Sequence, residues 1–291
     1  MYGAFFPIGM VAFLLGMANN YTLAINGTIA FLLNNQLGVS TQIPLPGAAL
    51  CAFPYEGEAV IAYANGPNTS FLMIDNRGVT KDLNFSLKGA VKACASYNGA
   101  IILLSEYNNT LSLGVYVLDE GNNTMVEVTE LKPVKDATGV VITSKYDAVY
   151  GPSGFYVYTN ENAVKVFDGN VVKARGYDNL ALMVLKDGSV VLFNVETGEK
   201  LLQLPLVLTP EYGKAADALL IEANGTNSKV LIAFRGGKVG LRLFKGTAEV
   251  LSINVDNACL IERSGDYVAA LINDKNLGRG VALFPYAWFE K

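Results

Sequence analysis

Hydrophobic residues after residue 18 fall in short runs rich in Val, Ile, Leu, Tyr, Phe and Thr. These runs are separated by turn-forming pairs such as Asn-Gly, Asp-Gly and Gly-Gly. β-branched and aromatic runs bounded by such pairs are typical of β-strands joined by tight turns. No stretch in this region sustains the period of about 3.6 residues that an amphipathic helix needs. The pattern therefore predicts an all-β protein with few helices.

The clearest repeat unit lies at residues 170–207. It reads as four strands, NVVKARGYD, LALMVLKDG, SVVLFNVETG and EKLLQLPLV. Lys186, Asp187 and Gly188 form one predicted turn, and Glu196, Thr197 and Gly198 form the next. We therefore predict a four-stranded antiparallel unit here.

Units of similar length fill the rest of the chain. They cover the N-terminal region up to residue 47 and the segments 48–89, 90–133, 134–169, 211–255 and 256–291, the last ending in a predicted strand AWFEK. Seven four-stranded units of about 40 residues match the period of a β-propeller, in which neighbouring sheets cover one another around a ring. We predict a seven-bladed propeller. Six blades with an N-terminal extension, or a β-sandwich, are the alternatives.

The longest apolar run, residues 4–18, allows more than one interpretation. We assign residues 1–18 to an apolar N-terminal segment that supplies the first strand of blade one, followed by a single propeller domain over 19–291. A signal peptide or membrane anchor is the second interpretation, because the run is apolar and ends in small residues. It is shorter than the roughly 20 residues of a spanning helix, and Pro7, Gly9 and Gly16 interrupt it.

The three cysteines, Cys51, Cys94 and Cys259, all fall in the predicted first strand of their units, near the propeller axis. No C-x-x-C spacing is present, which argues against a thiolate metal site or a thioredoxin-like motif. At most one disulfide is compatible with this number. We predict three buried thiols, since free cysteine is among the most buried residue types.

The segment 182–207 resembles a blade of the quinoprotein-type (PQQ-like) propellers. The likeness rests on the strand–turn pattern and on Asn194, Thr197, Gly198 and Lys200, which stand near the family's Asp-x-x-Thr-Gly-Lys turn. The family's repeated tryptophans are missing, since Trp288 is the only Trp. The resemblance implies the propeller fold and does not imply a quinone cofactor or dehydrogenase activity.

Composition excludes several kinds of chemistry. The 291 residues include no His, which removes Ser-His-Asp and Cys-His catalysis and His-ligated zinc. A net charge of −4 argues against a nucleic-acid partner, because such proteins usually carry a basic footprint. We expect no cofactor.

Three groups of residues could be interpreted as functional sites, but we interpret them as turn residues or as charged side chains exposed to solvent. The carboxylate pairs Asp119/Glu120 and Glu127/Glu130 are predicted to lie at strand ends or turns as solvated charge. Residues 273–278 lack the bidentate Glu of a calcium loop, and residues 235–238 join two strands rather than a strand to a helix. We therefore assign no catalytic, cofactor-binding or metal-ligating residue.

The positive signal is the N-x-[ST] sequon. Seven occur, and they mark the predicted glycosylation sites Asn20, Asn26, Asn68, Asn84, Asn108, Asn122 and Asn224. Most fall in predicted turns, where a glycan projects into solvent; Asn84 lies in a predicted strand. The sequons predict an extracellular, cell-surface or virion-surface protein.

Charge is absent from residues 1–55, and the first charged residue is Glu56. An uncharged surface avoids the cost of desolvating charge when it is covered. We therefore expect an assembly interface in residues 1–55, formed by self-association or with another surface protein. Residues 4–18 are a candidate membrane contact.

Two hypotheses of function follow. The first is a non-catalytic structural or adhesive propeller on a cell envelope, filament or virion. The combination of dense sequons, few cysteines and abundant Tyr and Asn is similar to surface and virion proteins of hyperthermophilic archaea. The second is a carbohydrate-active or solute-binding propeller that uses carboxylates at the axial mouth.

Overall fold

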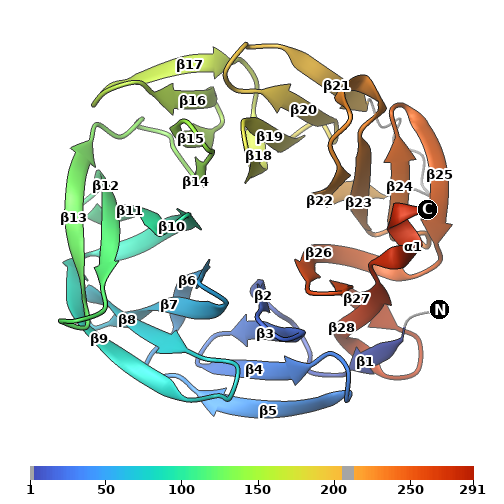
Figure 1. Ribbon diagram of the computed structural model, residues 1–291, viewed down its shortest axis with the longest axis horizontal. Coiled ribbons are helices and arrows are strands. Elements are labelled where there is room, and N and C mark those ends of the chain that lie inside the picture. The colour runs from blue at the N-terminus through green and yellow to red at the C-terminus, as the bar shows by residue number, and fades with distance from the viewer. Residues whose placement is uncertain (1–2, 205–212) are drawn as a thin grey trace.

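The chain forms a ring of seven four-stranded antiparallel sheets around a central axis (Figure 1). The computed structural model describes residues 3–204 and 213–291. Seven sheets confirm the predicted propeller and its blade count, and they exclude the β-sandwich and the six-bladed alternative. In every blade from one to six, the first strand of the unit lies innermost and the fourth lies on the rim.

Blades one to three follow the predicted units. Blade one consists of β2 (Phe13–Met17), β3 (Tyr21–Asn26), β4 (Ile29–Asn34) and β5 (Val39–Pro44). Blade two consists of β6 (Ala49–Tyr55), β7 (Glu58–Asn65), β8 (Asn68–Ile74) and β9 (Thr80–Lys88). Blade three consists of β10 (Ala90–Tyr97), β11 (Ala100–Tyr107), β12 (Thr110–Asp119) and β13 (Thr124–Leu131).

Blades four to six also follow the predicted units. Blade four consists of β14 (Gly139–Ile142), β15 (Asp147–Gly151), β16 (Gly154–Tyr158) and β17 (Ala163–Phe167). Blade five consists of β18 (Val171–Tyr177), β19 (Leu180–Leu185), β20 (Val190–Asn194) and β21 (Lys200–Leu204). Blade six consists of β22 (Lys214–Glu222), β23 (Lys229–Arg235), β24 (Leu241–Lys245) and β25 (Ala248–Ile253), with a short 3-10 helix, η1 (Gly225–Asn227), after β22.

Blade seven is assembled from both ends of the chain. It contains β26 (Asp256–Ser264), β27 (Tyr267–Asp274) and β28 (Gly278–Pro285), and its rim strand is β1 (Ala4–Phe6). The predicted fourth strand at 287–291 is wrong, because these residues form the short helix α1 (Ala287–Glu290). The rim position is already taken by β1, and α1 instead buries Phe289 completely against blades six and seven.

The apolar run 4–18 therefore contributes to two blades. Its first part is β1, on the rim of blade seven, and its last part is β2, the inner strand of blade one. Gly9, with φ of 84°, lies in the link between them, and its N–H donates to Arg279 O at 2.9 Å. Within the described residues, no helix is long and apolar enough to cross a membrane.

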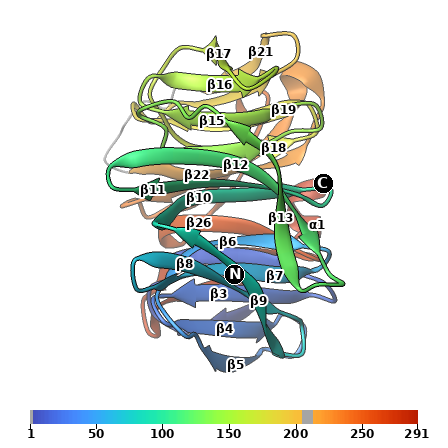
Figure 2. The ribbon, with the colours of Figure 1, turned by 90° about the vertical axis from the view of Figure 1, so that its left-hand side faces the viewer.

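The core consists of apolar layers between neighbouring blades. One such layer combines Leu23 and Ile25 of blade one with Ile61 of blade two, and all three are fully buried. Each sheet has right-handed twist, so the rim strands β9 and β13 run obliquely over the strands beneath them (Figure 2). Covering both faces of each sheet in this way explains the near-continuous apolar runs of the middle strands.

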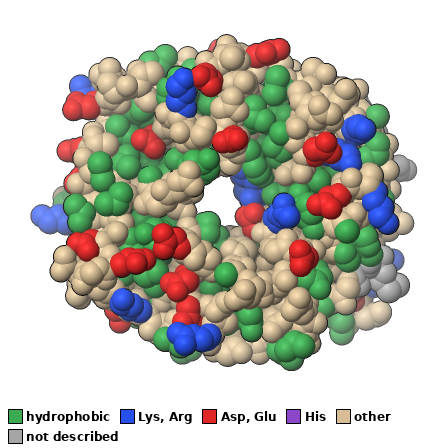
Figure 3. Space-filling view, viewed as in Figure 1, with side chains coloured by type: hydrophobic (Ala, Val, Ile, Leu, Met, Phe, Trp, Pro, Cys, Tyr) green, Lys and Arg blue, Asp and Glu red, His purple; other side chains and the backbone are tan. Residues whose placement is uncertain are grey.

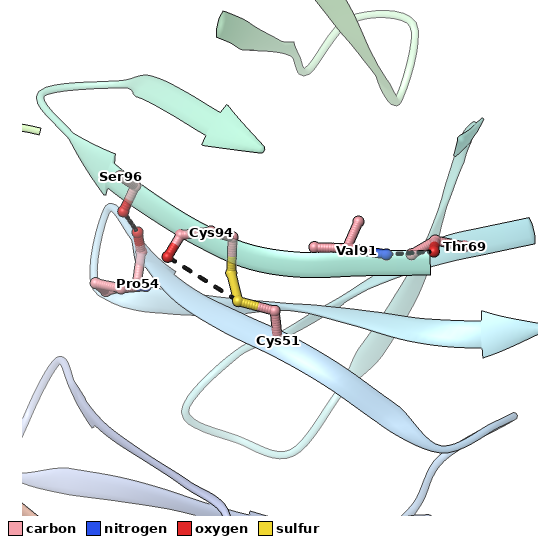
Figure 4. The surroundings of a disulfide bond; sticks show 6 residues. All are labelled: Cys51, Pro54, Thr69, Val91, Cys94 and Ser96. Carbon is pink, nitrogen blue, oxygen red and sulfur yellow. Dashed lines mark hydrogen bonds between the residues drawn. A yellow bond between two sulfur atoms is a disulfide. The ribbon is translucent and has the colours of Figure 1, made fainter. Parts of the chain in front are cut away.

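Cys51 in β6 and Cys94 in β10 form a disulfide between the inner strands of blades two and three (Figure 4). The prediction of three free thiols is therefore wrong for two of them. Their separation of 43 residues is close to one repeat, so positions offset by one residue on adjacent inner strands meet with a Cα–Cα distance of 6.2 Å. Cys259 is buried and free.

Candidate functional site

The uncharged segment 1–55 is spread over three neighbouring blades. It supplies β1 of blade seven, all of blade one, and β6, the inner strand of blade two. Because β6 lies inside the ring, only the parts of the segment on the rim and in the turns can face a partner. The rim strands β1 and β5 are adjacent around the ring (Figure 1). We call the surface of these two strands and the turn before β5 the uncharged rim.

Exposed apolar side chains lie on the uncharged rim. Leu37 is 73% exposed and Val39 is 57% exposed, and residues 40–42 between Val39 and buried Ile43 are exposed uncharged polar residues. The outer edge of β5 is not paired with any described strand. Such an edge presents a row of backbone N–H and C=O groups that can pair with another strand.

The other rim strands differ from β1 and β5 in charge. Each of the five described rim strands of blades two to six carries at least one charged side chain, namely Lys81, Asp82, Lys88, Glu127, Glu130, Lys165, Lys200 and Glu249. Charge on an edge strand disfavours edge-to-edge pairing. The rim of blades seven and one is therefore the part of the described ring that lacks this protection.

The turn before β5 is rigid and holds Leu37 outward. Asn34 Oδ1 accepts hydrogen bonds from the backbone N–H of Gln36 at 3.1 Å and of Leu37 at 3.0 Å, and Gly38 closes the turn with φ of 68°. Leu37 is thus placed in solvent by a hydrogen-bonded turn that fixes its position.

Blade five contains the same turn with different side chains. Asn194 Oδ1 accepts from the N–H groups of Glu196 and Thr197, and Gly198 closes the turn. These residues carried the resemblance to a quinoprotein-type blade, and their role here is the structure of a turn. Where blade five has Glu196 and Thr197 in this turn, blade one has Gln36 and Leu37. The two turns therefore have the same backbone hydrogen bonds, and the turn of blade one lacks the charge.

The junction of blades seven and one is held by buried polar groups. Thr22 Oγ1 lies 2.7 Å from both Asn35 Oδ1 and Ser264 Oγ, and Asn35 Nδ2 donates to Ser264 Oγ at 2.9 Å. All three side chains are buried. A satisfied buried network of this kind fixes the two blades relative to each other, so the uncharged rim is a preformed surface.

The predicted glycosylation sites differ in accessibility. Asn26, Asn84, Asn108, Asn122 and Asn224 are exposed, whereas Asn20 and Asn68 are half-buried. Asn20 also donates to Asp266 Oδ2 at 3.3 Å and accepts from the Asp266 N–H at 2.8 Å. Its side chain is thus engaged in the folded protein.

Three of the sites lie at equivalent turns of neighbouring blades. Asn26, Asn68 and Asn108 lie at the turns between the second and third strands of blades one, two and three. Because turns alternate between the two faces of an antiparallel blade, these three lie on the same face of the ring. Asn84 lies in the rim strand β9, as its sequence context predicts.

Two carboxylates, Asp217 and Glu262, belong to inner strands around the axis, where the alternative function places its candidate residues. Figure 3 shows an open hole at the centre of the ring with basic and acidic side chains at its margin. Asp217 of β22 is fully buried, and Arg175 of β18 donates to it through Nε at 3.3 Å and Nη2 at 2.8 Å. Arg175 Nη1 also donates to Glu262 of β26 at 2.8 Å. One guanidinium thus links blades five, six and seven.

The electrostatics of this cluster favour the charged forms. Burial alone would raise the pKa of Asp217, but the attraction of Arg175 and Lys173 and the hydrogen bonds from Arg175 outweigh it and hold that pKa below its usual value. Burial alone would lower the pKa of Arg175, but the attraction of Asp217 and Glu262 outweighs it. The pKa of Arg175 therefore lies well above its usual value. Asp217 is therefore ionised and paired with Arg175 and Lys173, and Glu262 is paired with Arg175.

Other residues considered in the sequence lie in turns or on the rim. Residues 275–277 form the turn between β27 and β28, where Asp274 Oδ1 accepts from Asn276 and Leu277 N–H groups. Asp119 ends β12 and Glu120 lies in the turn after it, as predicted. Glu127 lies within the rim strand β13 and Glu130 is its penultimate residue, and both are exposed. No group of three or more His, Cys, Asp or Glu side chains among the described residues is placed to hold a metal ion.

Comparison with solved structures shows the same fold. The WD40 β-propeller domain of Doa1 has a TM-score of 0.67 and 10% identity, covering 94% of this chain and 93% of that chain. U3-55K has a TM-score of 0.70 and 14% identity, covering 96% of each. No protein-family model and no curated protein sequence matches the chain. The chain is thus a seven-bladed β-propeller, and the quinoprotein-type resemblance is confirmed only at the level of the propeller fold.

Proposed function

We propose that this propeller is a non-catalytic, glycosylated surface protein that acts as a structural or adhesive element of a cell envelope, filament or virion. In this proposal it assembles through the uncharged rim. The observation that carries it is the exposed, uncharged edge of β5 beside the exposed apolar side chain of Leu37. Self-pairing of this edge brings no like charges together, unlike self-pairing of the charged rim strands.

Two further features support an extracytoplasmic location. The Cys51–Cys94 disulfide is a bond that forms and persists mainly in oxidising compartments. Five of the seven sequon asparagines are exposed, and N-linked glycans require accessible side chains. Asn26, Asn84, Asn108 and Asn224 are the exposed sites at which we expect glycans most directly, because no side-chain hydrogen bond in the described structure engages their amides.

The alternative, a carbohydrate-active or solute-binding propeller, requires carboxylates that are free to meet a ligand at the axis. Asp217 is 1% exposed and paired with both Arg175 and Lys173, and Glu262 is paired with Arg175. Since these ion pairs occupy the carboxylates, the cluster favours a role in joining blades. This favours the non-catalytic proposal over the alternative.

Sedimentation velocity over a range of concentrations tests the assembly. We expect the native protein to form dimers or larger species, and Val39→Lys to shift it to monomers because a charged side chain on an edge strand disfavours edge-to-edge pairing. The matched control is Val164→Lys on the rim strand β17, where the valine is 49% exposed. A wild-type monomer at every concentration, or an equal effect of both variants, would contradict the proposal.

Intact mass spectrometry of the protein from its native source tests the glycans separately. We expect masses above the 31.1 kDa of the polypeptide, and peptide mapping should place sugar on exposed sequons. A native protein carrying no sugar would contradict the glycosylated part of the proposal and leave the assembly test independent.

A further inference from the structure

A large hollow lies between blades six, seven and one. Its volume is about 1070 Å³, and its walls include Met10, Arg235, Lys238, Cys259 and Arg279. These residues come from the link between β1 and β2, the turn after β23, strand β26 and the start of β28. All of these segments meet on the face that carries the turns between second and third strands.

The hollow concentrates positive charge in a protein of net negative charge. Arg235, Lys238 and Arg279 line it, and Asp256 is the one acidic residue among its lining residues. None of the three cations forms an ion pair with a carboxylate within the described residues. The site therefore has an excess of two positive charges.

Arg279 is held in place by neutral acceptors. Its Nη1 donates to Asn257 O at 2.6 Å and Asn273 Oδ1 at 3.1 Å, and its Nη2 donates to Cys259 Sγ at 2.7 Å. These contacts orient the guanidinium without neutralising it. A positioned, unneutralised guanidinium is a favourable partner for a carboxylate, phosphate or sulfonate.

The turn that carries the other two cations is also anchored. Gly236 N–H donates to Asn257 Oδ1 at 3.1 Å, and Asn257 N–H donates to Gly237 O at 3.2 Å. As predicted from the sequence, residues 235–238 connect two strands, β23 and β24. Arg235 and Lys238 are exposed at the two ends of this anchored turn, so the turn supplies side-chain charge at the rim of the hollow.

The hollow also has accessible apolar lining. Met10 is 56% exposed, Ala12 is exposed and Leu260 is half-buried, and these side chains lie over the buried Val11 and Leu271. An inorganic anion would leave this apolar surface in contact with water. A ligand with an apolar body would cover it and gain from its burial.

We propose that this hollow binds a small amphiphilic anion, with a carboxylate, phosphate or sulfonate group attached to an apolar body. The acidic group contacts Arg279 and the cations of the turn, and the apolar body lies against Met10, Ala12 and Leu260. This inference does not depend on assembly through the uncharged rim.

Fluorescence titration with 8-anilinonaphthalene-1-sulfonate tests the proposal, since this probe joins a sulfonate to an aromatic body. We expect Arg235→Ala with Lys238→Ala to weaken binding about tenfold. N-phenyl-1-naphthylamine has the same body without the sulfonate, and its binding should not change. Lys186→Ala, at the equivalent turn of blade five, is the matched control and should bind both probes as wild type does. Equal affinity of all variants for the sulfonate probe would overturn the proposal.

Competition then distinguishes the kinds of anion. We expect decanoate to displace the sulfonate probe at much lower concentration than inorganic phosphate does. Displacement by phosphate at equal or lower concentration would overturn the requirement for an apolar body.

Cys259 provides a second readout at the site itself. It is the one free thiol of the chain and lines the hollow. We expect decanoate to slow its modification by methyl methanethiosulfonate in the wild type and in Lys186→Ala, and not in the double variant. Displacement of the fluorescent probe without protection of Cys259 would place the probe elsewhere and overturn the assignment.

Discussion

Phe6 lies directly opposite Val281 in the strand pair that joins the two ends of the chain. Phe6 is 4% exposed and Val281 is fully buried, and both belong to the apolar layer between blades seven and one. This pair therefore closes the ring and also supports the blade on which the uncharged rim lies.

Removing the Phe6 side chain should loosen that closure. We expect Phe6→Ala to lower the free energy of unfolding by about 3–4 kcal/mol, because it deletes a buried aromatic side chain and leaves a cavity. Urea denaturation followed by circular dichroism measures this change. Val128→Ala, at a 61% exposed position of the rim strand β13, should alter stability by less than about 0.5 kcal/mol. Similar effects of the two substitutions would argue against closure by β1.

Breaking the bond between blades two and three should destabilise the ring. The disulfide closes a loop with a sequence separation of 43, for which chain entropy predicts a contribution of about 4 kcal/mol. We expect the double variant Cys51→Ser with Cys94→Ser to lose about this much unfolding free energy. When the wild-type protein is unfolded without a reducing agent and alkylated, one thiol per chain should be modified. Three modified thiols would contradict the disulfide.

The axial ion pair should make stability depend on acid. The folded-state pKa of Asp217 is lowered, so its contribution is fully present above the unfolded value of about 3.9 and is lost as the pH falls through the lower folded value. We expect Asp217→Asn to cost about 3 kcal/mol at pH 7, since it leaves Arg175 with less compensation.

The pH dependence distinguishes this ion pair from a packing effect. The difference in unfolding free energy between wild type and Asp217→Asn should be constant from pH 7 to about pH 4 and should shrink below about pH 4. Denaturant titrations at each pH give this difference, in which the titration of all other groups largely cancels. A difference that persists unchanged at pH 2 would show that Asp217 does not act through its charge.

The repeat pattern predicted the strands and turns of blades one to six because each blade is a local meander. The propensity for tight turns and the alternation of apolar runs act within about ten residues. Asn34 and Asn194 mark the same turn in two blades, and this local signal was readable in blade five. The uncharged segment 1–55 was equally visible, because charge requires no knowledge of the fold.

The features that the sequence did not predict depend on contacts between distant residues. Nothing local to Phe6 indicates that it pairs with Val281, and without that pairing 287–291 has the composition of a fourth strand. The partner of Cys51 follows only once the inner strands of adjacent blades are aligned. The basic hollow likewise combines Arg235 and Arg279 from two blades, whose charges look unrelated along the chain.

Hydrogen–deuterium exchange along β5, at increasing protein concentration, tests most directly whether the uncharged rim is the assembly surface. We expect those backbone amides of residues 39–43 that point away from β4 to become protected as concentration rises, because the C=O groups of a second strand would accept hydrogen bonds from them. Amides of the charged rim strand β17 should show no such change. Equal, concentration-independent exchange of β5 and β17 would contradict assembly through the uncharged rim.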